Sequence, residues 1–100
     1  PAWVTAAGSL GSFDGNTAIS TITLTATDAT SFAVTSGTLT AGLTLTSGSG
    51  SATITGTQTA HTSAATDNFT VTATDAEGQT AARAFSISYS FGISGSGGFN

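Results

Sequence analysis

His61 is the only histidine of the chain, and histidine is the side chain that most often moves protons in enzyme active sites. A catalytic histidine also needs a nucleophile and an orienting carboxylate within reach. The sequence around it, residues 59–63, offers only Ser and Thr as nucleophiles, and both occur throughout the chain. We therefore expect His61 to be an exposed loop residue, and we expect no catalytic residue in this chain.

Four carboxylates, Asp28, Asp67, Asp75 and Glu77, are the candidates for binding a cation. Ca²⁺ is held by about six to eight oxygen ligands. The best local candidate is the segment from Asp75 to Glu77, but it lacks the dense acidic spacing of a calcium loop. We expect these side chains to cap turns, and we expect neither a metal nor a cofactor. A pair of glycosidase carboxylates is also disfavoured, because no elements that build a deep pocket are evident.

Arg83 carries the only fixed positive charge. It shares strand parity with the apolar residues that follow it, which would point its side chain inward. A bulge near residues 81–82 would turn it outward instead. If it points inward, we expect it to pair with a carboxylate such as Asp28 or Asp75 and to fix one end of a strand.

Two further residues have both a binding and a structural interpretation. Trp3 could anchor a sugar or a partner, but an early Trp in a β-sandwich more often packs beneath a sheet edge, which we expect here. Asn68 begins a glycosylation sequon with Phe69 and Thr70. Because this sequon opens an expected core strand, we interpret it as a chance match.

Charge is scarce in this chain. Only 6% of its 100 residues are charged, whereas about 25% is usual in soluble domains. With no Lys and a net charge of −4, no row of cations could neutralise the phosphates of a nucleic acid or bind an anionic membrane surface. No apolar run reaches the roughly 18 residues of a membrane span. The absence of Cys excludes disulfides, thiol catalysis and thiolate metal sites.

The elements that must position these residues are β-strands. Residues 21–27, 69–74 and 85–91 alternate between an apolar residue and Thr or Ser. A period of two predicts strands with one buried face and one exposed face, and here the exposed face is hydroxylated and almost uncharged.

Turn signals divide the chain into about seven strands, which predicts an all-β, Ig-like two-sheet β-sandwich of antiparallel strands. A closed barrel is the main alternative. Glycines in residues 8–13 indicate a kink or a switch between sheets, and Gly15 is expected to take a positive φ in a turn led by Asp14. We expect one domain over residues 1–91 and a Gly/Ser-rich tail or linker over residues 92–100. The expected strands are 2–5 continued by 8–13, 19–26, 31–34, a short strand ending at 45, 52–55, 67–75 and 80–91.

Three segments together resemble the putative Ig (cadherin-like) domain family. They are residues 37–45 (GTLTAGLTL), 54–57 (ITGT) and 69–75 (FTVTATD). Thr40 and Gln58 stand where that family usually has Pro. Physical reasoning agrees with the resemblance: we expect Leu43, Leu45 and Ile54 to fill the core between the sheets, and Gly42 and Gly56 to relieve backbone strain at bends.

The resemblance implies a structural module, since such domains occur in bacterial surface proteins and in structural proteins of phages. We expect a non-catalytic module of a phage virion (tail, neck, fibre or capsid accessory), in a virion or extracellular location. The alternatives are an adhesin or surface-array domain of a bacterium, or a carbohydrate-binding module that takes a host glycan. Free-standing sandwiches normally guard their edge strands with Lys, Pro or bulges, but this chain has no Lys and its one Pro is Pro1. We therefore expect other subunits, adjacent domains or a second copy to cover the edges or faces.

Overall fold

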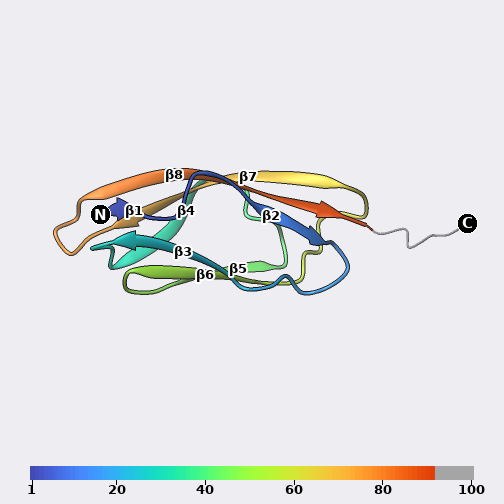
Figure 1. Ribbon diagram of the computed structural model, residues 1–100, viewed down its shortest axis with the longest axis horizontal. Helices are drawn as coiled ribbons and strands as arrows, with labels where there is room; N and C mark the ends of the chain where they lie inside the picture. The colour runs from blue at the N-terminus through green and yellow to red at the C-terminus, as the bar shows by residue number, and fades with distance from the viewer. Residues whose placement is uncertain (92–100) are drawn as a thin grey trace, which may run out of the picture.

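The computed structural model describes residues 1–91 and shows two four-stranded sheets packed face to face (Figure 1). Within these residues the chain forms strands and no helix, so no helix could cross a membrane. The all-β sandwich is confirmed, with eight strands rather than seven. The strands are β1 (Ala2–Trp3), β2 (Gly8–Asp14), β3 (Ile22–Thr27), β4 (Ser31–Gly37), β5 (Leu43–Ser47), β6 (Ser51–Gly56), β7 (Ala65–Thr74) and β8 (Thr80–Ser90).

One sheet has the strand order β1-β3-β6-β5 and the other the order β2-β8-β7-β4. The extra strand arises because the chain leaves the first sheet after Trp3 and joins the second at Gly8, whose φ of 104° is left-handed. The sheet switch expected from the glycines is confirmed. The expectation that every strand is antiparallel is wrong, because β2 pairs with β8 in parallel.

Several strand limits differ from those expected. The second expected strand begins at Ile22 rather than Ile19, because the Ile19 N–H donates to the carbonyl of Gly56 outside the regular ladder. β4 extends to Gly37, beyond a register shift between Val34 and Ser36. The expected tail, residues 92–100, lies outside the described residues.

The core lies between the two sheets and is built from the inward positions of the alternating strands. Ile54 is fully buried, as expected, whereas Leu43 and Leu45 are only half-buried because β5 is an edge strand. Apolar side chains from both sheets complete this core: Ile22, Leu24, Ala26, Phe32, Ala52, Phe69, Val71, Ala73, Phe85, Ile87 and Tyr89.

Two glycines allow a close approach of backbones beside β5. Gly42 and Gly56 have φ angles of 95° and 124°. A Cβ atom on Gly56 would collide with the carbonyl oxygen of Gly42, so both positions relieve strain as expected. Gly15 does not have the expected positive φ. It is needed because the ring of Phe91 packs where its Cβ would stand.

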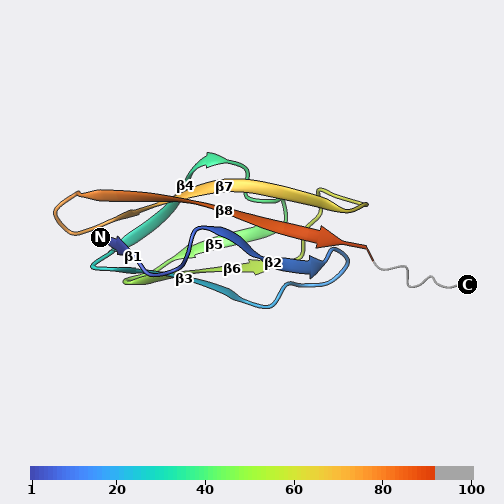
Figure 2. The ribbon, with the colours of Figure 1, turned by 45° about the horizontal axis from the view of Figure 1, so that its top comes forward.

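The four edge strands differ in regularity. β1 has only two residues, and both β2 and β4 contain register shifts. β5 instead pairs with β6 through five consecutive residues without a shift. Figure 2 shows β4 curling away at the edge of its sheet, whereas β5 runs straight along β6.

Candidate functional site

A chain of hydrogen bonds links four side chains near one end of the sandwich. The hydroxyl of Tyr89 donates to Thr40 Oγ1 over 2.7 Å. Thr40 Oγ1 donates to Asp67 Oδ2 over 2.5 Å, and His61 Nε2 lies 2.8 Å from the same oxygen. We call these four residues, Thr40, His61, Asp67 and Tyr89, the Asp67 network.

The environment of the Asp67 network favours an ionised carboxylate. Burial acts to raise the pKa of Asp67, but hydrogen bonds from Thr40 and His61, together with the charge of His61, outweigh it and lower the pKa. Because an ionised carboxylate only accepts hydrogen bonds, Thr40 and His61 act as its donors. Burial raises the pKa of Tyr89, which keeps the phenol protonated and able to donate to Thr40.

The loop that carries His61, residues 57–64, is held by backbone contacts as well. Gln58 is buried, its Nε2 donates to the carbonyls of Gly15 and His61, and its Oε1 accepts from the His61 N–H. His61 is therefore not the exposed loop residue that we expected: its side chain is 25% exposed and is bonded to Asp67. The sequence around His61 could not reveal this, because its contacts with Gln58 and with Asp67 of β7 form only when the loop is folded.

The Asp67 network has the composition of a catalytic dyad without the access that catalysis needs. Thr40 is the hydroxyl nearest to the carboxylate, but it is 1% exposed and it already donates to Asp67 and accepts from Tyr89. A nucleophile must reach its substrate. The network therefore serves to fix the loop against β7 and β8. Of the two departures from the family pattern, Thr40 is a member of the network, and Gln58 holds the backbone of the loop that carries His61.

The proposed calcium candidate is a turn. Asp75 Oδ1 accepts hydrogen bonds from the N–H groups of Glu77 at 3.0 Å and Gln79 at 2.8 Å, and Glu77 itself is exposed. Among residues 1–91 no three His, Cys, Asp or Glu side chains gather in a metal-binding group. The turn-capping role expected for Asp75 is confirmed, and Asp28 lies exposed in a separate turn with a φ of 63°.

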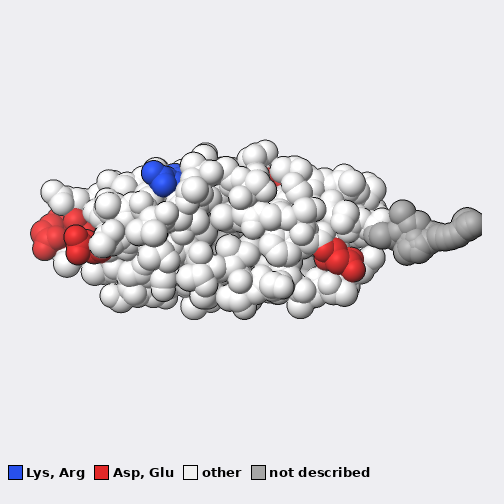
Figure 3. Space-filling model, viewed as in Figure 1, with Lys and Arg blue, Asp and Glu red and all other residues white. Residues whose placement is uncertain are grey.

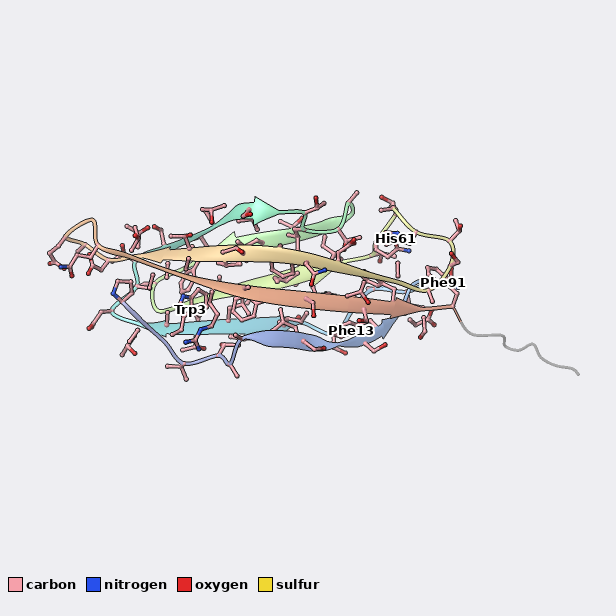
Figure 4. All side chains as sticks on the ribbon, turned by 90° about the horizontal axis from the view of Figure 1, so that it is seen from above. Trp3, Phe13, His61 and Phe91 are labelled. Atoms are coloured by element: carbon pink, nitrogen blue, oxygen red, sulfur yellow. The ribbon has the colours of Figure 1, made fainter. Side chains whose placement is uncertain are left out.

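Arg83 and Trp3 both tie the first strands to β8. Arg83 Nη1 donates to the carbonyl of Thr5 over 3.0 Å, so its partner is a backbone oxygen and not the carboxylate that an inward orientation predicted. Trp3 Nε1 donates to the carbonyl of Ala81. The Trp3 ring makes edge contacts with Phe32 and Phe85, which confirms its packing beneath the sheet edge. Figure 4 shows Trp3 far along the sandwich from His61.

Acidic side chains gather at the two ends of the molecule, and its sides carry little charge. Figure 3 shows these acidic clusters, one basic side chain on the side of the sandwich, and mostly uncharged atoms on the rest of the face in view. The outward positions of the β3, β6 and β5 strands are all hydroxylated, with the residues Thr23, Thr25, Thr27, Ser51, Thr53, Thr55, Thr44 and Thr46.

An open groove of about 240 Å³ crosses the outer face of the other sheet, where the β4 register shift and Gly8 leave space. Asn68, the first residue of the sequon, is exposed on its wall. No charged side chain lines this groove, and its polar groups are small hydroxyls and one amide. The lining residues are Gly8, Ser36, Gly37, Asn68, Phe69, Thr70, Ala84, Phe85 and Ser86.

The strand order defines the class of this protein as an Ig-like β-sandwich, since β1-β3-β6-β5 and β2-β8-β7-β4 match the two sheets of that architecture. The family model described as "Putative Ig domain" matches residues 4–90, and the chain belongs to that family. Ig-like domains are generally non-catalytic interaction modules. Comparisons with curated proteins and with solved structures return no match.

Proposed function

We propose that this domain is a structural or display module of a phage virion protein, in a tail, neck, fibre or capsid accessory. One observation carries the proposal: the outward positions of β3, β5 and β6 are all Thr or Ser and carry no charge, whereas acidic side chains gather at the ends of the sandwich (Figure 3). Hydroxyl groups cost less free energy to desolvate than charges do. Such flanks therefore suit close packing in a crowded assembly.

A domain of a bacterial adhesin or surface array is the second candidate, because the same family membership and the same flanks would serve it. A carbohydrate-binding module is less well supported. Such modules present several aromatic rings on one face, but Tyr89 is buried and Trp3 packs against core rings. Phe99, the third aromatic considered for this role, lies outside the described residues.

Two measurements test the proposal. Light scattering over a concentration series of the 100-residue chain should reveal a defined oligomer, which a shell, fibre or filament component would form; a monomer throughout would favour a spacer or display unit. Antibodies against the domain, used in immunoelectron microscopy of the source culture, should label phage particles. Labelling of bacterial surfaces alone would overturn the virion assignment in favour of an adhesin.

A further inference from the structure

Among the four edge strands of residues 1–91, β5 is the one without a feature that opposes the addition of another strand. Natural sheets protect their edges by short strands, bulges, charges or Pro. β1 has two residues, and β2 and β4 are bulged. β5 contains no charge and no Pro, and its register with β6 runs without interruption from Leu43 to Ser47.

The outward edge of β5 has few partners within residues 1–91. Apart from its ladder with β6, the backbone of β5 makes one hydrogen bond, from the Leu43 N–H to the carbonyl of Thr40 in the preceding turn. The Ser47 hydroxyl accepts from the Phe32 N–H of β4, which ties one end of the strand to the other sheet. Leu43 and Leu45 remain only half-buried along this edge.

We propose that β5 is a self-association edge, on which β5 of a second copy pairs antiparallel about a two-fold axis at Leu45. An isologous contact brings identical residues together, so charges on the edge would repel one another. β5 is neutral, and the charges of the chain lie mainly at the ends of the sandwich (Figure 3). A second copy therefore meets this edge without like-charge repulsion, although each chain carries a net charge of −4.

The pairing has a defined register. With Leu45 on the axis, Thr44 lies opposite Thr46 of the second copy, and this pair occurs twice. Both threonines are exposed and outward, and Thr–Thr pairs across antiparallel strands are favourable. The added strand would extend the sheet to β1-β3-β6-β5 followed by the same four strands of the second copy, and it would cover Leu43 and Leu45.

The contact is small, because a pair of five-residue strands buries less than the roughly 1,000 Å² of a stable interface. Association through β5 is therefore weak in dilute solution and becomes effective where an assembly holds copies at high local concentration. The inference rests on the proposed assembly role and names one surface through which that role would be performed.

Cysteine cross-linking tests the register directly, because the chain has no native Cys. Thr44→Cys and Thr46→Cys chains are mixed at about millimolar concentration and oxidised. Directly opposed residues have Cα atoms about 4.5–5.5 Å apart, within disulfide range. We expect a 44–46 heterodimer. In a homodimer of either variant alone, the two Cys Cα atoms lie about 8 Å apart, which is beyond disulfide reach. Each variant alone should therefore stay largely monomeric. Equal cross-linking in all three samples, or none in the mixture, would overturn the inference.

Charge variants distinguish failure of the edge from failure of the assembly role. Thr44→Lys with Thr46→Lys should abolish the concentration-dependent mass increase, and Thr44→Lys with Thr46→Glu should restore it by pairing opposite charges. Thr23→Lys with Thr55→Lys adds the same charge to the same face away from the edge, and should leave association intact. Oligomers that persist in the first variant would reject the edge and keep the assembly role, whereas a wild-type monomer without cross-links would reject the edge and favour a spacer or display unit.

Discussion

β7 has a carboxylate near each end, and the two are satisfied in different ways. Asp75, directly after β7, accepts hydrogen bonds from backbone N–H groups two and four residues away in its own turn. Asp67, near the start of β7, accepts from side chains of Thr40 and His61, which lie 27 and 6 residues away. The hydrogen bonds to Asp75 therefore come from local backbone, with the Pro1 amino group 3.7 Å from its other oxygen, whereas those to Asp67 come from side chains that only the fold brings together.

The difference separates local stability from long-range stability. The Asp75 contacts close the hairpin between β7 and β8, so their loss should open that turn first. The Asp67 contacts join residues 57–64, the turn before β5 and the end of β8. Because these segments are distant in sequence, their coupling should affect the whole cooperative unit.

Removing the Thr40 hydroxyl should have the largest effect. Thr40→Val leaves the buried Tyr89 hydroxyl without its acceptor and removes one donor from Asp67. Since an unsatisfied buried polar group costs about 1–3 kcal/mol, we expect a loss of about 3 kcal/mol in the free energy of unfolding, measured by urea denaturation. Thr40→Ser keeps the hydroxyl and should lose less than about 1 kcal/mol. If Thr40→Ser lost as much as Thr40→Val, packing of the methyl group would stabilise this site as much as the hydroxyl does, and the leading role of the network would be rejected.

Removing the Asp75 carboxylate should have the next largest effect. Asp75→Ala leaves the N–H groups of Glu77 and Gln79 without an acceptor, and we expect a loss of about 2 kcal/mol. Hydrogen exchange should become faster at these two amides before it becomes faster elsewhere. Asp75→Asn retains an oxygen acceptor and should largely preserve their protection. Uniform acceleration across both sheets would contradict a local role.

The same contrast explains what the sequence could reveal. Capping by Asp75 was predictable because its donors lie within four residues and follow a general turn rule. The Asp67 network was not, because no sequence pattern relates Thr40 to residue 67. Its one available signal was the replacement of the family's two prolines by Thr40 and Gln58, two of the three polar residues that the fold buries.

The fold shows the same division. Alternation predicts the inward and outward faces of β3, β7 and β8, because side-chain direction in a strand depends only on parity. The parallel pairing of β2 with β8 depends on which sheet the chain joins after Trp3, a choice made by tertiary packing. The partner of Arg83 was missed for the same reason: the Thr5 carbonyl reaches it only through that switch.

Removing the His61 side chain should have a smaller effect than either of the first two variants. The ring is partly exposed, so water can replace part of its contact with Asp67. We expect His61→Ala to lose about 1 kcal/mol, which corresponds to a fall of about 4–8 °C in the melting temperature. A His61→Ala, Thr40→Val double variant should lose less than the sum of the single losses, because both act on Asp67. Strict additivity would show that the two contacts are independent.

The pH dependence at Asp67 should be the smallest effect, because burial and hydrogen bonding act on its pKa in opposite directions. The folded-state pKa lies below the ordinary value of 3.8. Its contribution to stability is therefore fully present above that value and is lost as the pH falls through the folded-state pKa. Asp67→Asn cannot titrate, so the stability difference between wild type and this variant should shrink between neutral pH and pH values below 3.8.

Tyr89→Phe provides the matched control. The pKa of Tyr89 is raised above its ordinary value of 10.0, so this variant should change the alkaline limb of the profile and keep the acid limb. If the difference for Asp67→Asn stayed constant through the acid range, the hydrogen bonds to its carboxylate would not favour the ionised form, and the contrast with Asp75 would reduce to the distance of the donors along the chain.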